Sequence, residues 1–333
     1  MRERDAGGAG SDRDLDSAYR CVATSVLPSE LKNAVLSRLR EQGDSVFVAR
    51  PWTKEDLLRL NKPGIFPHEM FTAAERTLQA LRNSDAPCSV WEASDRYGVL
   101  TRCPSSLAKE LGEKKLSLSR PRGVFDIQNL NVTMAHVAEE LLDGFDIFDE
   151  GALLSLGSTF TSFHVEDYCL QTMSTLQRVH SRAADACKIW FVTTDPVKGQ
   201  NMRRAQYHCL CLSVIECADY ILVQQEGQTI YIPPLAYHAV QTVYSETVVT
   251  EERFSLLCGT LFADLRKESL WRGNVSLWMR NHQTGHRHGS TKCLLKKYVK
   301  YVEDPVISKR PSKKQKRKEK AASASATRWN KIK

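Results

Sequence analysis

The sequence predicts an α+β fold, in which a sandwich or jelly roll of short strands carries helices on its outside. Short β-rich runs recur from Ala152 onward, with turn residues between them, as in all-β layers. Before them, from Ala23 to about Arg82, apolar residues recur at helical spacing. No apolar run approaches the ~20 residues that span a bilayer. We therefore expect a globular protein without a membrane contact.

Composition agrees with a large folded core. The 333 residues are 42% hydrophobic, and the mean hydropathy is −0.38. The stretch Met1–Asp5 is charged and is not followed by an apolar region, which argues against an export signal. Ten cysteines occur without the spacing of a disulfide framework, so we expect free thiols in a reducing compartment.

The positive charge of the chain belongs to its last segment. The chain carries a formal net charge of +8, but residues 305–333 hold eleven lysines and arginines against Glu319 alone. Residues 1–304 are therefore close to neutral. The cluster Lys309–Lys318 resembles a nuclear localisation signal, and such clusters also bind nucleic acid by neutralising phosphates. A tail that only solubilises the chain is the alternative.

The first third of the chain is predicted to be helical. Residues 1–20 are rich in Gly, Asp and Arg and have little to bury, so we expect disorder there. A helix covers Leu31–Leu39, and a second follows the acidic first turn at Thr53–Asp56. A third helix begins at Phe71 and runs through Leu81. These helices are expected to pack on the outside of a sheet.

Strands dominate the middle of the chain. Two early strands are predicted at Cys88–Trp91 and Val124–Ile127, with a helix over Val132–Leu142 after them. Seven further strands are predicted at Ala152–Ser158, Phe160–His164, Leu170–Leu176, Ile189–Thr193, Tyr220–Gln224, Thr229–Ile232 and Phe254–Leu261. Three more helices are predicted at Met202–Cys217, Leu270–Arg280 and Thr291–Tyr301.

Three side chains have the pattern of a metal site. His164 and Glu166 are two apart, so they point to the same face of an extended chain. His238 lies 74 residues further on, near the end of another strand-like run, whose approach reads as a turn, a strand and a Pro-Pro stop. Two imidazoles and one carboxylate form the facial triad that binds Fe(II) and leaves coordination positions open. The alternative is an exposed His-x-Glu on an edge strand.

The surroundings of these residues resemble one known family. The segments H-x-E-D at 164–167, K-x-W at 188–190 and G-Q-T-I-Y-I-P-P-x-x-Y-H-A-V at 227–240 are similar to those of JmjC proteins. JmjC proteins are Fe(II)- and 2-oxoglutarate-dependent oxygenases with a cupin fold, that is, a double-stranded β-helix. The resemblance covers roughly residues 120 to 260.

The resemblance implies the site residues. His164, Glu166 and His238 become the iron ligands, and Lys188 becomes the partner of the distal carboxylate of 2-oxoglutarate. Lys188 lies 24 residues past His164, and the polar surplus Arg178–Asp185 is predicted to be an enlarged hairpin loop. Thr161 and Ser174 are further candidates for cosubstrate contacts, although strict alternation turns Thr161 away from His164.

We therefore expect a JmjC-type dioxygenase that uses Fe(II), 2-oxoglutarate and O2 in the nucleus, with a histone tail as leading substrate and lysine demethylation as leading reaction. The alternatives are a protein side-chain hydroxylase and a non-catalytic module that binds chromatin or nucleic acid through residues 309–333. The predicted divisions are a disordered N-terminus (1–20), a helical scaffold (21–119), a cupin catalytic domain (120–262), C-terminal helices (263–304) and a basic disordered tail (305–333).

Overall fold

The computed structural model describes residues 11–43, 45–46, 52–59, 62–72, 88–92, 99–102, 123–128, 132–166, 170–178, 186–248 and 254–263. For 88–92, 99–102 and 123–128 this description is of the backbone alone. All these residues belong to the first of two compact units, residues 1–281 and 282–333.

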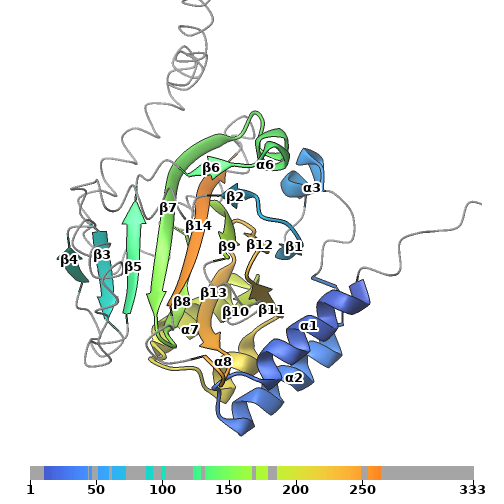
Figure 1. The fold of residues 1–333 in the computed structure, drawn as a ribbon, viewed down its shortest axis with the longest axis vertical. Helices are drawn as coiled ribbons and strands as arrows, with labels where there is room; N and C mark the ends of the chain where they lie inside the picture. Colours follow the sequence, from blue (N-terminus) through green and yellow to red (C-terminus); the bar gives the residue numbers. More distant parts are fainter. Residues whose placement is uncertain are drawn as a thin grey trace, which may run out of the picture. The chain divides into compact units, whose positions relative to one another are not determined.

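Two antiparallel sheets form the centre of the described structure (Figure 1). The larger contains, in spatial order, β1 (Gly64–Phe66), β12 (Thr229–Ile232), β9 (Gln171–Leu176), β14 (Phe254–Ala263), β7 (Asp146–Leu156), β5 (Gly123–Gln128), β3 (Cys88–Glu92) and β4 (Val99–Arg102). The smaller contains β11 (Tyr220–Gln225), β10 (Ala186–Thr193), β13 (Tyr237–Tyr244) and β8 (Phe160–His164). A short separate pair joins β2 (Phe71–Thr72) to β6 (Thr133–Met134).

The two sheets face each other across a shared apolar core. Trp190 and Leu222 from the smaller sheet pack in one buried cluster with Leu176, Ile230 and Leu257 from the larger sheet. Because every second residue of a strand points to the same side, residues two or four positions from these core residues also lie on the inner face. On β10 and β13, the inner face therefore also includes Lys188, His238 and Thr242.

A second core covers the outer face of the larger sheet. Leu154, Met173, Tyr231 and Phe262 are almost fully buried there. Two short helices close this core at one end, α3 (Lys54–Arg59) and α6 (His136–Leu141). Both lie beside β2 and β6 in Figure 1.

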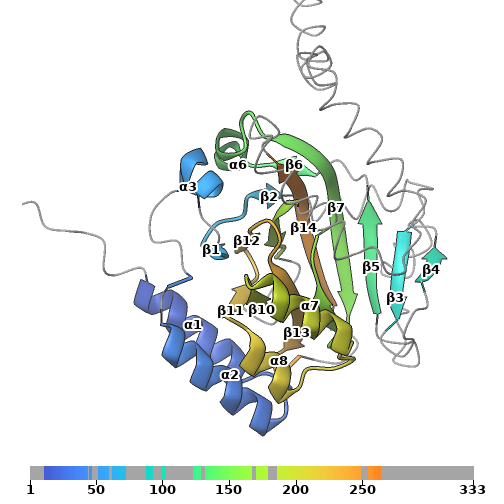
Figure 2. The ribbon, with the colours of Figure 1, turned by 180° about the vertical axis from the view of Figure 1, so that it is seen from behind.

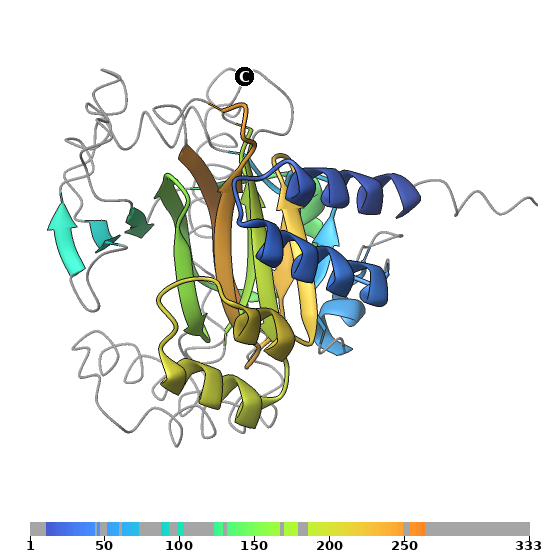
Figure 3. The same ribbon diagram turned by 90° about the horizontal axis from the view of Figure 1, so that it is seen from below.

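Four helices cover the outer face of the smaller sheet. They are α1 (Ser11–Ala23), α2 (Ser29–Gln42), α7 (Pro196–Ala205) and α8 (Leu212–Cys217). Helices α1 and α2 pack together against β11, whereas α7 contacts β8, β10 and β13 (Figure 2). Seen from below, α1 and α2 lie on the side away from β3, β4 and β5 (Figure 3).

Local chemistry explains where α7 begins and how closely it approaches the sheet. Asp195 caps the helix, since its carboxylate accepts from the backbone N–H groups of Val197 at 2.8 Å and Lys198 at 3.2 Å. Pro196 occupies the first turn, where its missing N–H costs nothing. A Cβ at Gly199 would collide with the Tyr237 ring, so only glycine lets α7 pack this tightly on β13.

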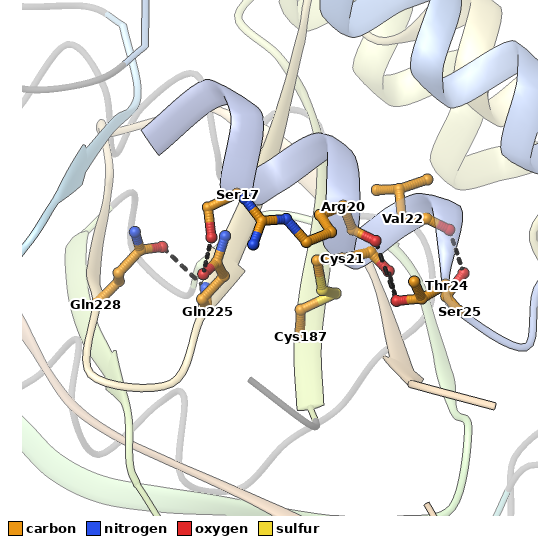
Figure 4. Close-up of a disulfide and its surroundings, with 9 residues drawn as sticks. All are labelled: Ser17, Arg20, Cys21, Val22, Thr24, Ser25, Cys187, Gln225 and Gln228. Carbon is orange, nitrogen blue, oxygen red and sulfur yellow. Dashed lines mark hydrogen bonds between the residues drawn. A yellow bond between two sulfur atoms is a disulfide. The ribbon is translucent and has the colours of Figure 1, made fainter. Parts of the chain in front are cut away.

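A disulfide joins α1 to the smaller sheet. Cys21 on α1 is bonded to Cys187 on β10, 166 residues away in the sequence (Figure 4). Ser17, one turn earlier on α1, donates a hydrogen bond to Gln225 Oε1 at 2.8 Å. The expectation that all cysteines are free thiols is therefore wrong for this pair, because the fold brings together two residues that no sequence spacing relates. Cys209, Cys211, Cys217 and Cys258 are free.

The predicted α+β class is confirmed, and most predicted strands are present. Phe160–His164 and Thr229–Ile232 are strands with the predicted bounds, whereas β7 is longer than its prediction and begins at Asp146. Strand β13 was not predicted as an element. Strands β9 and β10 belong to different sheets, so they do not pair as the two arms of a hairpin as predicted, and residues 179–185 between them lie outside the described residues. The double-stranded β-helix assignment stays a prediction.

Several helix predictions are corrected. Residues 11–20 are helical in α1 rather than disordered, because packing on α2 and β11 buries Ala18. The predicted helical scaffold also contributes strands β1 to β4, and Phe71–Thr72 begins a strand rather than a helix. Residues Met202–Cys217 form parts of two helices separated by a loop. The predicted helices after Leu270 and the basic tail lie outside the described residues.

Within the described parts of the chain, none of the helices is both long enough and apolar enough to cross a membrane.

The disulfide is expected to stabilise the folded chain. Replacing Cys21→Ser should lower the free energy of unfolding by about 2 to 4 kcal/mol, since the bond closes a long loop in the unfolded state. Denaturant unfolding without a reducing agent measures this, and Cys209→Ser, which changes an exposed free thiol, is the control. Thiol labelling that finds Cys21 and Cys187 both free in the oxidised protein would contradict the assignment.

Candidate metal centre and anion site

Strand pairing brings the two histidines of the predicted cluster together. His164 is the last residue of β8, and it lies directly opposite His238 near the start of β13. Glu166 follows two residues after the end of β8. One ligand atom from each of these side chains lies within 4.8 Å of the others. Among the described residues this is the one group of three or more His, Cys, Asp and Glu side chains with such a spacing.

Backbone carbonyls orient both imidazole rings. Nδ1 of His164 lies 2.9 Å from the carbonyl oxygen of Ser162, and Nδ1 of His238 lies 3.3 Å from that of Ala236. A carbonyl can only accept, so each Nδ1 carries the proton and each Nε2 keeps its lone pair. This second bond is the usual partner of a metal-binding histidine. In both rings Nε2 is therefore the nitrogen that can bind an ion.

The environment keeps His238 neutral. Its side chain is almost fully buried, and burial lowers its pKa well below the usual value, with a further lowering from His164 and an opposing effect of the Ala236 carbonyl. The two imidazole centroids are 4.2 Å apart. Glu166 Oε1 lies 3.6 Å from His238 Nε2 and is partly accessible. Neutral imidazoles and one carboxylate are the protonation states that divalent metals require.

The donor set fits a divalent ion of the Fe(II) class. Ligand atoms that each lie about 2.1 Å from one ion are about 3 Å from each other. The three ligand atoms here lie within 4.8 Å of one another, so the side chains would have to move together by an ångström or two to bind the same ion. Two histidines and one carboxylate leave the remaining coordination positions to small molecules. The cluster can therefore bind a metal ion and expose it to a substrate.

An irregularity in β8 changes the position of Thr161. The β8–β13 register shifts between His238 and Val240, so that Thr161 rather than Ser162 lies opposite Val240. Strict alternation would turn Thr161 away from His164, but the extra residue of the bulge returns it to the same side. Thr161 is exposed. Its contact with a cosubstrate stays a prediction.

Lys188 lies inside the protein, between the two sheets. Its Nζ donates to Ser155 Oγ on β7 at 3.0 Å and to Thr242 Oγ1 on β13 at 2.9 Å. Only 3% of Lys188 is exposed. No carboxylate pairs with it among the side chains that the structure describes. Its partners are thus neutral hydroxyls, which offset the positive charge only in part.

Burial changes the protonation of Lys188. Desolvation lowers its pKa from 10.5 to about 7. A buried ammonium normally has a carboxylate partner, because an unpaired charge in the interior is costly. This lysine shares its side of β13 with the metal cluster: it lies opposite Thr242, four residues or about 13 Å of strand beyond His238. An anion bound between the two positions would complete the ion pair.

Trp190 lies on the same inner face of β10, two residues after Lys188. Its ring lies 5.6 Å from that of His238, and its indole N–H donates to Gln224 Oε1 at 3.0 Å. Gln224 Nε2 in turn donates to the carbonyl of Ser174 at 2.8 Å, which links the two sheets. The Ser174 hydroxyl lies near Thr172 and Gly259 rather than among the partners of Lys188. Its role toward a cosubstrate stays a prediction.

Sequence reasoning missed the hydroxyl partners of Lys188. Thr242 was within reach, because it alternates with His238 and Val240 along a strand, but that strand was not predicted. Ser155 lay in a predicted strand, yet nothing in the sequence showed which strand would face it. Trp190 enters the sequence prediction only through the K-x-W segment.

Comparisons with known proteins add little to this geometry. No protein-family model and no curated protein matches the sequence. Among solved structures, YcfD, a ribosomal oxygenase from Escherichia coli, aligns with 71% of this chain at 11% identity and a TM-score of 0.37. The match spans 58% of the YcfD chain. The site geometry, and not this likeness, therefore carries the functional argument.

Loss of a cluster residue should abolish metal binding. We expect His164→Ala to weaken Mn(II) or Fe(II) binding by more than about 100-fold, since losing even an outer partner of a ligand costs 10–100-fold. Anaerobic calorimetry measures the affinity. His136→Ala, which changes an exposed histidine on α6, should leave it unchanged. Equal affinity in both variants would exclude the cluster as the metal site.

Removing the buried charge should stabilise the ligand-free protein. Below pH 7 Lys188 is charged in both the folded and the unfolded state, so the folded state bears the full cost of burying the charge. Between pH 7 and 10.5 the lysine is neutral in the folded state but still protonated in the unfolded state. The stability of the wild type therefore rises with pH across this range. Lys188→Met should therefore be more stable than wild type at pH 6, by at most roughly 5 kcal/mol, and this advantage should shrink toward pH 10. Denaturant unfolding across this range tests it. A variant that is less stable at pH 6 would contradict the assignment.

Proposed function

We propose that this chain is an Fe(II)- and 2-oxoglutarate-dependent oxygenase of JmjC type, built on a double-stranded β-helix. One observation carries the proposal: a buried lysine, which has no carboxylate partner among the described residues, shares the inner face of the smaller sheet with a His-Glu-His cluster. The metal cluster accounts for one end of a keto acid and the lysine for the other. 2-Oxoglutarate carries both groups, a chelating keto acid and a distant carboxylate.

Each residue has a defined part in this proposal. His164, Glu166 and His238 hold the ion, and Lys188 binds the distal carboxylate with Ser155 and Thr242 beside it. Trp190 and the apolar core exclude water from the space between them. When bound, iron and 2-oxoglutarate supply the oxidising chemistry: one oxygen atom of O2 enters a substrate C–H bond, and the other enters succinate as CO2 leaves.

For the substrate, we propose a protein side chain. The predicted nuclear address at 309–318 favours a histone tail, and oxidation of an N-methyl group on lysine would release formaldehyde and leave a demethylated lysine. Oxidation at another carbon would leave a stable alcohol, which makes side-chain hydroxylation the second candidate. A non-catalytic chromatin- or nucleic-acid-binding module would bind metal and 2-oxoglutarate without turnover, or bind neither.

Turnover assays separate these candidates. With Fe(II), 2-oxoglutarate, O2 and a peptide library that includes methylated histone tails, wild type should form succinate, and His164→Ala and Lys188→Met should reduce it to background. Mass spectrometry of the peptides then distinguishes the loss of a methyl group from the gain of an oxygen atom. Equal succinate from wild type and His164→Ala would rule out the proposed chemistry.

A further inference from the structure

A buried serine opposite one of the partners of Lys188 has a hydroxyl that bonds to nothing in the described structure. Ser255 on β14 has no exposed surface, and its Oγ lacks a hydrogen-bond partner. Buried hydroxyls are nearly always hydrogen-bonded, because leaving one unpaired forfeits its bonds to water. An exception of this kind calls for a physical reason.

The strand register places Ser255 beside Ser155, one of the two hydroxyl partners of Lys188. Ser255 lies directly opposite Ser155 in the β7–β14 pair, and paired residues project from the same face of a sheet. Ser155 accepts from Lys188 across the interior, so that face is the inner one. Leu257, two residues after Ser255, packs in the core between the two sheets, which leads to the same conclusion.

The hydrogen-bonding capacities around this point are unbalanced. The Lys188 ammonium has three protons, of which Ser155 and Thr242 take two. The Ser255 hydroxyl adds another proton without an acceptor. A carboxylate is a pure acceptor with room for several hydrogen bonds, so it would take the remaining lysine proton and the serine proton together.

From this geometry we propose that Ser255 is a specificity-determining residue, whose hydroxyl donates to the distal carboxylate of the ligand that Lys188 anchors. The inference rests on the proposed function and extends it to one residue that sequence reasoning did not select. Ser255 and Lys188 together would favour a keto acid with a second carboxylate over one that ends in a methyl group.

Ser255→Ala tests the inference in the full-length, Mn(II)-loaded protein. The probes are 2-oxoglutarate and 2-oxopentanoate, which has the same carbon chain but a methyl group in place of the distal carboxylate. The variant should bind 2-oxoglutarate about tenfold more weakly, as for a hydrogen bond to a charged group, with 2-oxopentanoate binding unchanged. Calorimetry measures both affinities without turnover.

The stability of the ligand-free variant separates a binding role from a structural one. Since the Ser255 hydroxyl has no partner among the described residues, Ser255→Ala should melt at the same temperature as wild type or higher. Ser25→Ala is the matched control, because Ser25 is equally buried but donates to the carbonyl of Val22 at 2.8 Å. That variant should melt lower and bind both keto acids as wild type does.

The outcomes distinguish the two proposals. If wild type binds 2-oxoglutarate in a manner that depends on Lys188, and Ser255→Ala binds it equally well, the role of Ser255 is overturned and the proposed function stands. A lower melting temperature of Ser255→Ala with unchanged affinity would assign the serine to structure alone. If wild type shows no preference for 2-oxoglutarate over 2-oxopentanoate and Lys188→Met changes nothing, the proposed function fails and the inference fails with it.

Discussion

The candidate site depends on the pairing of β13 with a strand on each side. Through β8, this pairing sets His238 opposite His164, and through β10 it sets Thr242 opposite Lys188. His238 and Thr242 are four residues apart, so they share a face of the strand. A one-residue slip would turn both away from the interior at once. The backbone hydrogen bonds of one strand thus position both the candidate metal cluster and Lys188 with its partner Thr242.

Lys188 illustrates a conflict between stability and function within that arrangement. An ammonium group enclosed by hydroxyls remains poorly solvated, and its lowered pKa expresses this cost. An apolar side chain of similar length would pack in the same place without the penalty. A lysine at this position is understandable if a bound anion supplies the negative charge that Lys188 lacks as a partner. The same anion would give the Ser255 hydroxyl the acceptor that it lacks among the described residues. Both residues lie on the inner faces of the two sheets, and both carry a donor proton that has no acceptor among the described residues.

The outer face of the smaller sheet connects this interior to the N-terminal helices. Cys187 and Lys188 are neighbours on β10 and project to opposite sides, so the strand that holds the buried cation is also bonded to α1. On the same outer face, Gly199 of α7 packs against Tyr237, which is the neighbour of His238 on β13. Helices remote in sequence from the metal ligands thus support the strands that carry them.

Local sequence was sufficient for the candidate ligands and for most strands. The spacing of His164 and Glu166, and the turn before Thr229, act over a few residues, where alternation and turn chemistry are reliable guides. Tertiary structure alone decided the bulge at Thr161, the Cys21–Cys187 bond, the hydrogen bond of Lys188 to Ser155, and the pairing of Ser155 with Ser255. These features join segments separated by tens to hundreds of residues. Which of these segments meet depends on how the two sheets pack face to face, and the local propensities of the sequence do not determine that packing.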